Sequence, residues 1–499
     1  MSFRERLCVD LDLLWPLVIL AGFGVYVSLV PLPPNDYWWH LKIGELIYTT
    51  GRVPATNLFA WTLPADAPFF YGAWLGQYLL YLLYRWGGVA LTLFARTVLL
   101  LIAFWLMTYL ARLRSGSWRL AAPALALAAG MSLNNLIVRP QIWSWLPFMC
   151  FLLLLTRYAA GDLRWTWLLL LPPLMIFWVN AHGAFVLGLA LLGIFGVGEL
   201  LRTALRLSEA RPWPEIGALA GVGLLTGLAT LINPRGVDIV AYVWGLMTDP
   251  PSQQLVVEWQ SPAPTGIPNT VFYVSVLLLL FVLAYTRYRL TPTDVLLTAG
   301  FLWLAWSGQR YVIWYGWAVM PLLARAVEEL PLPRPIFAAQ RNLLNLVLAL
   351  LLFVPVLLVQ PWWVERLPLP ETYWEGVWRD VPQGPLLRTS TPLGAVAYLW
   401  ANPGGRLFNE MGYGSYLIWA LPDQGVFIDP RVELYPLEMW EDYIRIGDGV
   451  RSLELLEAYG ADRVLLDRES QEELARVLAS APAWEREYRD EFAEIWRKR

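Results

Sequence analysis

The chain carries little charge for its length. Only 15% of its 499 residues are charged and 57% are hydrophobic, whereas soluble domains carry about a quarter charged residues. The formal net charge is −3, so the chain lacks the basic excess of a nucleic-acid-binding protein. Long apolar runs recur between residues 13 and 359. The composition therefore excludes an ordinary soluble domain and predicts an α-helical integral membrane protein.

Cysteine and phosphate-binding loops are also scarce. The two cysteines, Cys8 and Cys150, are far apart in the chain and indicate neither a disulfide nor a metal site. No Gly-rich motif ending in Lys-Ser or Lys-Thr is present, which argues against ATP-driven transport by this chain. We therefore expect no cofactor, with a divalent metal as an open alternative that no ligand pattern supports.

Arginines indicate how the chain crosses the membrane. Arg4 and Arg6 precede the first apolar segment, which places the N-terminus in the cytoplasm by the positive-inside rule. Residues 74–86 are apolar but number only 13, too few to span the hydrocarbon core. This segment is expected to be an interfacial or re-entrant helix. The later arginine-rich loops then all fall on the cytoplasmic side.

The resulting topology has about eleven spans. They are residues 13–31, 91–110, 120–138, 142–156, 165–180, 184–201, 216–232, 271–285, 295–307, 311–323 and 343–359. Together they form a predicted transmembrane domain over residues 1–361, with a first outer loop at residues 32–88. We expect the protein in the inner (plasma) membrane, with the C-terminal part outside the cytoplasm.

Residues 362–499 differ in character because charges become frequent and no further span is present. Helical patterns cover residues 393–400, 453–459 and 471–478, and strand patterns cover residues 425–429 and 463–466. Residues 487–496 are typical of a closing hairpin. This part is predicted to be a small α/β domain on the outer side.

The first outer loop contains the most informative stretch, residues 33–62. Asp36, His40 and Gly44 recur every four residues and lie on one face of a predicted helix. Asn35 or Asp36 can cap its start, and Gly51 suits its end. The helix is predicted to lie in the membrane interface with its aromatic rings among the headgroups. The alternative is an anchoring helix whose polar residues have no role.

Further polar residues occur at the outer ends of several spans. They are Arg139, Asn180, His182, Asn233, Arg235, Glu258 and Arg310. Each one alone can be a snorkelling side chain or a helix-end cap. Together they predict an outer cavity that suits a phosphate-bearing, lipid-linked substrate, since arginine binds phosphate and a carboxylate can accept a proton from a hydroxyl.

Two residues of the outer domain, Asp429 and Arg431, are two positions apart. If the strand continues past Pro430, they share one face. We expect this face to look onto the cavity near Asp36. The alternative is a local salt bridge that closes the domain.

Several motifs carry a resemblance to known proteins. They are NDYWWHLKIGELIYTTGRVP at residues 35–54, VRPQIWS at 138–144, WVNAHGAFVLG at 178–188, TLINPRG at 230–236, VEWQSP at 257–262 and the stretch 414–435. This pattern resembles uncharacterised bacterial multi-pass proteins. These in turn resemble the GT-C superfamily, which includes the protein O-mannosyltransferases and the lipid A aminoarabinose transferase. The likeness spans most of the chain through loose motifs.

The resemblance implies an essential acid in the first outer loop, a polyprenyl-phosphate sugar donor and an outer C-terminal domain. Asp36 matches that acid by position. Many members carry a second acid in this loop, but Asn35 precedes Asp36 here, and residues 71–75 contain no acid. The sequence therefore departs from the pattern of those members at this second acid.

The predicted function is a membrane glycosyltransferase that moves a sugar from a polyprenyl-phosphate donor to a glycan, lipid or protein acceptor at the outer face. The predicted catalytic residues are Asp36, His40 and His182. The predicted substrate-binding residues are Arg139, Asn180, Asn233, Arg235, Glu258, Arg310, Asp429 and Arg431. Membrane lipids are expected partners and nucleic acid is not. Two alternatives stay open: a transporter or flippase for lipid-linked glycans, and a non-catalytic assembly subunit.

Overall fold

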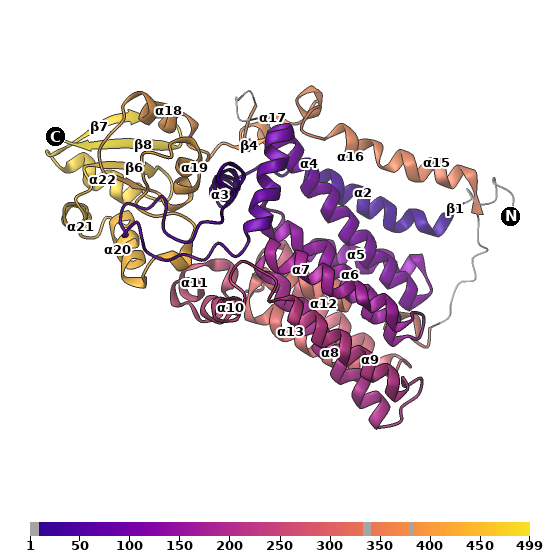
Figure 1. Ribbon diagram of the computed structural model, residues 1–499. Helices are drawn as coiled ribbons and strands as arrows, with labels where there is room; N and C mark the ends of the chain where they lie inside the picture. The colour runs from indigo at the N-terminus through magenta and orange to yellow at the C-terminus, as the bar shows by residue number, and fades with distance from the viewer. Residues whose placement is uncertain (1–8, 333–340, 380, 382–383, 385) are drawn as a thin grey trace.

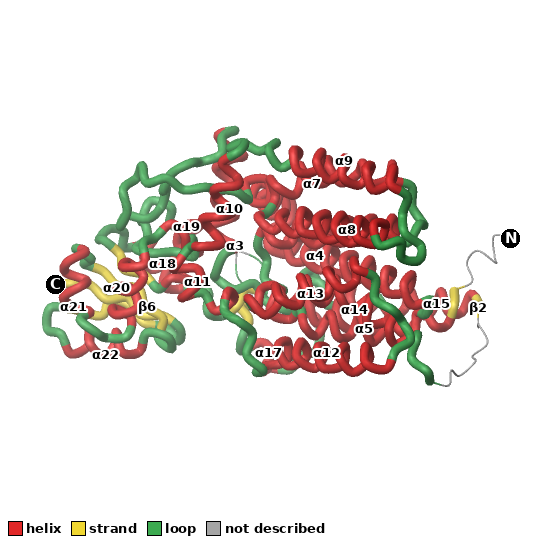
Figure 2. The backbone as a smooth tube through the Cα atoms, turned by 90° about the horizontal axis from the view of Figure 1, so that it is seen from below, coloured by secondary structure: helices red, strands yellow, loops and turns green. Residues whose placement is uncertain are grey.

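The computed structural model describes residues 9–332, 341–379, 381, 384 and 386–499. Arg4, Arg6 and Cys8 lie outside the described residues. Long helices run side by side in a bundle, and the C-terminal region covers one end of it (Figure 1). The same bundle is seen from below in Figure 2.

The bundle coincides with the predicted spans. It contains α2 (Leu14–Leu29), α4 (Trp74–Ser115), α5 (Trp118–Met131), α6 (Trp145–Ala159), α7 (Leu171–Ala181), α8 (Val186–Ala204), α9 (Trp213–Ala229), α12 (Gly266–Tyr285), α13 (Pro292–Ser307), α14 (Val312–Glu328), α15 (Leu343–Leu352) and α16 (Val354–Leu358). Each predicted span falls on a helical segment of this list. A two-stranded ladder pairs β1 (Val9–Asp10), which lies before α2, with β2 (Arg341–Asn342), which lies before α15.

Five helices are long and apolar enough to cross a membrane. They are Leu11–Leu29, Trp74–Ser115, Pro140–Ala159, Gly183–Ala204 and Gly266–Tyr285. Three shorter apolar helices accompany them, at Trp165–Ala181, Trp213–Ala229 and Leu343–Leu358. Large apolar side chains such as Leu224 on α9 and Leu277 on α12 are exposed, as lipid-facing residues are. The chain is therefore a membrane protein, and the number of eleven crossings stays a prediction.

The segment 74–86 forms the first part of α4. Gly87 and Gly88 interrupt the helix with non-helical backbone angles, and Gly88 has φ 62° and ψ −156°, which essentially only glycine adopts. Residues 74–86 therefore form a helix of their own, and a kink at Gly87 and Gly88 joins this helix directly to the next span.

Helix α3 (Tyr37–Thr50) is buried between α4 and the C-terminal region. A Cβ added at Gly44 would lie 2.2 Å from the Gln77 carbonyl oxygen, so glycine permits the close approach of α3 and α4. The Trp38 ring is fully buried, 5.1 Å from the Tyr416 ring between centroids. The expectation that the aromatic rings lie among lipid headgroups is wrong for Trp38, because the C-terminal region covers it.

The two ends of α3 agree only in part with the caps predicted from the sequence. Gly51 ends the helix in the left-handed region with φ 68°, and its N–H bonds the Ile47 carbonyl, as predicted. The Asp36 side chain makes no capping hydrogen bond. Its carboxylate is engaged elsewhere, with an arginine of the bundle.

The C-terminal region contains a four-stranded sheet in the order β5-β6-β8-β7. Its strands are β5 (Leu407–Asn409), β6 (Arg463–Asp467), β7 (Trp484–Arg489) and β8 (Ala493–Lys498), and its helices are α17 (Glu371–Trp374), α18 (Leu393–Ala401), α19 (Met411–Ala420), α20 (Leu437–Gly447), α21 (Ser452–Tyr459) and α22 (Glu472–Ser480). A small ladder pairs β3 (Val377–Trp378) with β4 (Leu387–Arg388). Strand β5 is parallel to β6, and the other pairs are antiparallel.

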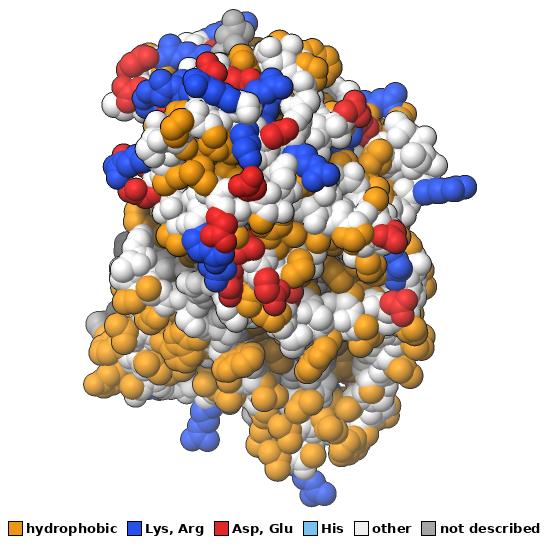
Figure 3. Space-filling view, turned by 90° about the vertical axis from the view of Figure 1, so that its left-hand side faces the viewer, with side chains coloured by type: hydrophobic (Ala, Val, Ile, Leu, Met, Phe, Trp, Pro, Cys, Tyr) orange, Lys and Arg blue, Asp and Glu red, His pale blue; other side chains and the backbone are white. Residues whose placement is uncertain are grey.

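The predicted helices near residues 393, 453 and 471, the strand at 463–466 and the closing hairpin agree with this arrangement. The predicted strand at 425–429 is wrong, because only Val426 pairs there, in an isolated bridge with Ala60 of the first outer loop. Charged side chains of both signs gather on the upper part of the molecule in Figure 3, and apolar side chains cover its lower part. The boundary at residue 361 stays a prediction.

Candidate functional site

Three carboxylate and guanidinium groups that are far apart in sequence meet at the end of the bundle that the C-terminal region covers (Figure 1). Asp36 precedes α3, Arg139 precedes the 3-10 helix η3 (Pro140–Ser144), and Glu258 lies in η6 (Val257–Trp259). The Arg139 guanidinium lies 3.4 Å from an Asp36 oxygen and 2.7 Å from a Glu258 oxygen. The side chains of Asp36 and Glu258 are 24% and 32% exposed. A molecule in the surrounding solvent can therefore reach both carboxylates.

Each nitrogen of the Arg139 guanidinium makes a hydrogen bond in this cluster, since its Nε also donates to Gln141 at 3.0 Å. Burial raises the pKa of Asp36, and Arg139 only partly opposes this effect. The nearby Glu258 charge raises the same pKa further. Burial acts to raise the pKa of Glu258 too, but Arg139 and Arg310 outweigh it and hold that pKa below its usual value. Asp36 is therefore the carboxylate of this pair whose basicity its surroundings increase.

Arg310 lies beside this cluster in the 3-10 helix η7 (Gln309–Tyr311). Its guanidinium is 4.5 Å from the centroid of the Trp259 ring. Burial and the neighbouring Arg139 lower its pKa, but arginine stays charged at neutral pH. No carboxylate pairs with Arg310 within the described ranges. Its charge is thus available to an anion.

The two histidines lie close enough to this cluster to feel its charges. Burial lowers the pKa of His40 well below its usual value, with His182 and Arg139 adding to the effect. Burial also lowers the pKa of His182 to about 3, with help from Arg310 and Arg139. Both rings are therefore neutral at pH 7.

The hydrogen bonds of His182 fix which ring nitrogen carries the proton. The backbone N–H of Ala184 donates to His182 Nδ1 at 3.2 Å, and the Ser144 hydroxyl lies 2.8 Å from the same atom. Trp178 donates to that hydroxyl oxygen, so the Ser144 proton points to Nδ1. The neutral ring then carries its proton on Nε2 and can donate it to an oxygen. His40 Nδ1 lies 2.9 Å from the Gln77 amide nitrogen.

Asn180 and Asn233 hold the local structure. The Asn180 side chain accepts from the Trp74 indole at 2.7 Å and donates to the Ile232 carbonyl at 2.8 Å. The Asn233 side chain closes the turn before α10 (Asp238–Thr248) by donating to the Thr230 carbonyl and accepting from the Arg235 backbone. Both amides are used within the protein, so a substrate-binding role for them gains no support.

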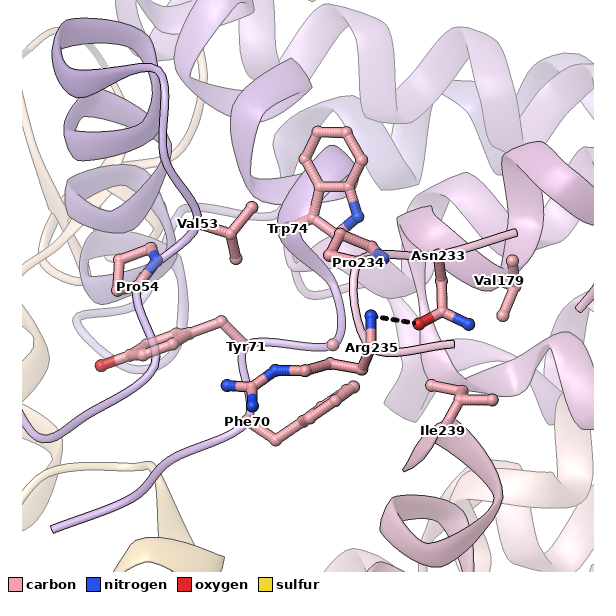
Figure 4. Close-up of a pocket in the computed structure, with 11 residues that line it drawn as sticks. Val53, Pro54, Phe70, Tyr71, Trp74, Val179, Asn233, Pro234, Arg235 and Ile239 are labelled. Atoms are coloured by element: carbon pink, nitrogen blue, oxygen red, sulfur yellow. Dashed lines mark hydrogen bonds between the residues drawn. The ribbon is translucent and has the colours of Figure 1, made fainter. Parts of the chain in front are cut away.

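Arg235 lies in a separate small pocket (Figure 4). Its exposed guanidinium is 5.4 Å from the centroid of the Phe70 ring. The cavity there is only about 20 Å³, which is the space of about one water molecule. The Phe70 ring stacks on Tyr242 of α10. The Arg310 charge acts to lower the pKa of Tyr242, so this tyrosine is near both the pocket and the cluster. Arg235 is therefore near the cluster and not part of it.

Asp429 and Arg431 form a buried ion pair. Both side chains are 0% exposed, and their closest atoms are 2.7 Å apart. Tyr435 donates to Asp429, and Arg431 donates to the Tyr71 hydroxyl at 3.1 Å. No strand continues past Pro430, because the 3-10 helix η9 (Val432–Leu434) follows. The pair ties the C-terminal region to the first outer loop, and the expected open face near Asp36 is not formed.

Removal of one partner of this ion pair should destabilise the fold. We expect Arg431→Met to lower the unfolding free energy by about 3–5 kcal/mol, because it leaves the Asp429 charge buried and unpaired. Arg379→Met is the matched control, since the Arg379–Glu371 pair is exposed and should contribute less than about 1 kcal/mol. Thermal unfolding of both variants in one detergent measures the difference. Equal stability of the two variants would contradict the structural role.

Glu433 is a site residue that sequence reasoning missed. It lies in η9, two residues after Arg431, and faces α11 (Pro250–Leu255) of the outer segment. Burial raises its pKa to about 7, and the Asp249 and Asp36 charges add to the shift. Its only sequence signal was the short distance to Arg431. Glu433 is thus close enough to the cluster for the Asp36 charge to act on it.

The residues present were also compared with metal sites. Across residues 9–332, 341–379 and 386–499, no group of three or more His, Cys, Asp and Glu side chains is arranged to hold an ion. Arg139 lies between the Asp36 and Glu258 carboxylates. The guanidinium supplies the positive charge that holds these two acids together.

Comparisons with known proteins bear on the fold. No protein-family model matches the chain, and no curated protein matches it in sequence. The oligosaccharyltransferase AglB from Archaeoglobus fulgidus, in complex with an inhibitory peptide and a dolichol-phosphate, has a similar structure, with a TM-score of 0.51 and 14% identity. The match covers 92% of this chain and 69% of AglB.

The apo form of the same enzyme gives a TM-score of 0.50 at 14% identity, over 92% of this chain and 70% of that one. The arabinofuranosyltransferase AftD from mycobacteria gives a TM-score of 0.51 at 14% identity. That match covers 96% of this chain but only 41% of AftD. Both proteins are glycosyltransferases of the GT-C superfamily. The chain therefore has the GT-C fold, as the resemblance of its motifs predicted.

Proposed function

We propose that the protein is a membrane glycosyltransferase that moves a sugar from a polyprenyl-phosphate donor to an acceptor hydroxyl at the outer membrane face. The observation that carries this proposal is the cluster at the outer end of the bundle. It combines Asp36, a carboxylate whose pKa burial raises, with the Arg310 guanidinium, which feels the Asp36 and Glu258 charges but forms no ion pair among the described residues. The similarity to AglB, whose structure was determined in complex with a dolichol-phosphate, supports a lipid-phosphate donor.

The proposed reaction is one displacement at the sugar. The acceptor hydroxyl gives its proton to the Asp36 carboxylate while its oxygen attacks the anomeric carbon of the sugar. The bond between that carbon and the phosphate oxygen breaks, and the electron pair leaves with the lipid phosphate. Arg310 binds the phosphate as negative charge develops on the leaving oxygen.

The neighbouring residues position these groups. Arg139 holds the Asp36 carboxylate in place, and Glu258 holds Arg139. His182 is neutral and can donate its Nε2 proton to a phosphate oxygen. His40 packs on Trp39 with ring centroids 3.6 Å apart and orients the start of α3. The C-terminal region, through Glu433, borders the acceptor side.

Analysis of bound lipid tests the donor class. Lipids extracted from the purified protein are identified by mass spectrometry, for the natural chain and for Arg310→Gln. We expect polyprenyl-phosphate species to be enriched over the bulk membrane lipids in the natural chain and depleted in the variant. Bulk lipids alone in both preparations would contradict a lipid-phosphate donor.

The pH dependence of transfer follows from the Asp36 pKa. A general base acts only when ionised, so kcat/KM should rise with pH through the Asp36 pKa, which burial places above the usual value near 4. The Glu258 charge contributes to this raised pKa. Glu258→Gln should therefore move the acid limb of the profile to lower pH. An acid limb that stays in place or moves to higher pH would contradict the assignment of Asp36.

A further inference from the structure

A second cavity lies at the other end of the bundle. It forms where the C-terminal ends of α4, α6, α8 and α14 meet the N-terminal end of α13. Its volume is about 230 Å³, roughly ten times that of the pocket beside Arg235. Helix α4 starts beside the C-terminal region and runs 42 residues to this cavity (Figure 1). The arginine distribution predicts that this end faces the cytoplasm.

Most charges in the walls of this cavity neutralise one another. Arg114 pairs with Asp294 at 2.5 Å. Arg202 lies 3.2 Å from Glu209 and 3.6 Å from Glu199. These pairs neutralise the carboxylates of Asp294 and Glu209, whereas one oxygen of Glu199 is buried without a hydrogen bond and has only Arg202 at 3.6 Å.

Arg157 is the exception among the guanidinium groups of the wall. Arg325 pairs with Glu329 at 3.0 Å, but Arg157, which lines the cavity in the last turn of α6, has no ion pair within the part of the chain that the structure describes. Its Nε is buried without a hydrogen-bond partner, and so is the hydroxyl of the adjacent Thr156. The Asp162 carboxylate lies exposed at the rim, where water solvates it. The cavity thus offers one unused positive charge.

Part of the remaining wall is apolar, beside the polar side chains of Tyr288, Thr291 and Thr293. Leu110, Phe195 and Leu297 are buried in it, and Leu113 is 39% exposed on the outside of the bundle. A free anion gains nothing from such a wall, whereas a lipid can place its headgroup on Arg157 and its chains along the apolar exterior. Basic pockets between membrane helices on the cytoplasmic side are typical sites for anionic lipid headgroups.

We propose that this cavity binds the phosphate headgroup of an anionic phospholipid of the cytoplasmic leaflet, with the Arg157 guanidinium as its anion contact. The site lies at the opposite end of the bundle from Asp36 and takes no part in the proposed transfer. Its occupant stabilises the packing of α4, α6, α8, α13 and α14 at this end, because a ligand that binds only the folded state raises its stability.

The test titrates lipid onto the purified full-length protein in detergent and follows thermal unfolding by tryptophan fluorescence. The probes are phosphatidylglycerol, phosphatidylcholine and inorganic phosphate. The variants are Arg157→Gln and, as matched control, Arg164→Gln, since Arg164 is exposed on the same side and does not line the cavity. We expect phosphatidylglycerol to raise the unfolding temperature in a saturable way. The apparent Kd for phosphatidylglycerol should rise about tenfold in Arg157→Gln, because a charge-assisted hydrogen bond is lost. It should stay unchanged in Arg164→Gln.

Three results would overturn the proposal. Equal weakening in both variants would show only general attraction between arginines and anionic lipid. Equal affinity for phosphatidylcholine would remove the role of charge. Saturable stabilisation by inorganic phosphate, with no further gain from phosphatidylglycerol, would make the ligand a soluble anion. If Arg157→Gln does not fold, Arg157→Lys serves in its place, because it keeps the charge. Its affinity for phosphatidylglycerol should be measurable but lower than that of the natural chain and of Arg164→Gln. An affinity equal to that of the natural chain would contradict a specific contact with the guanidinium.

Discussion

Replacement of Asp36 by asparagine should reduce sugar transfer by about a hundred- to ten-thousand-fold, the range in which a general base contributes. Asparagine keeps the shape of the side chain and removes the group that accepts the proton. The variant should fold normally, because the Asp36 side chain makes no capping hydrogen bond with α3. Arg139 keeps its shorter contact with Glu258 at 2.7 Å. The measurement is kcat of the purified variant with saturating donor.

The matched control for this change is Asp66→Asn. Asp66 lies in the same outer loop and is exposed, so the control removes the same charge from the same loop outside the cluster. We expect transfer by this variant to equal that of the natural chain. A parallel decrease in both variants would indicate that loop charge matters and that Asp36 is not the base. Normal transfer by Asp36→Asn would favour the alternative of a non-catalytic assembly subunit.

Replacement of Arg310 by glutamine should raise the KM for the donor by about 10- to 100-fold, because hydrogen bonds between charged groups contribute about 1.5–3 kcal/mol. It should also lower kcat, since the phosphate gains negative charge as it leaves. Arg310→Lys keeps the charge and loses the planar, bidentate geometry, so it should restore only part of the activity. Steady-state kinetics with varied donor separates these effects.

Two arginines of the outer side serve as comparisons for Arg310. Arg52 is exposed in the first outer loop, and Arg52→Gln should leave the donor KM unchanged. Arg235→Gln should have a smaller effect than Arg310→Gln, because Arg235 lies in the separate pocket with Phe70. An increase in KM of the same size for all three variants would contradict a specific phosphate site at Arg310.

Sequence periodicity and loop charge predicted the helices of the bundle well. The reason is that a membrane span must be long, apolar and helical, and all three properties are visible in the residues. The same reasoning failed at Trp38, since amphipathic helices look alike whether lipid or protein covers them. Only the fold shows that α19 covers this ring.

The sequence predicted the types of residue that meet at the site, but it did not predict which of them pair with one another. Asp36, Arg139, Glu258 and Arg310 stood out because charge is rare at the outer span ends, and the fold brings them together. Asp429 was singled out for its spacing from Arg431, but it is buried in an ion pair with that residue, and the pair holds two parts of the chain together. Sequence alone cannot separate these cases, because an ion pair and a catalytic carboxylate use the same residues.

The central claim is that this outer cluster transfers sugar from a lipid phosphate. The most direct measurement follows radiolabelled sugar from a polyprenyl-phosphate donor, incubated with purified protein and membranes that supply acceptors. The account predicts that label leaves the donor lipid with the natural chain and with Asp66→Asn, and that it stays on the donor with Asp36→Asn. Label that leaves the donor at the same rate with Asp36→Asn, or that never leaves it with the natural chain across a panel of donor sugars, would contradict the account.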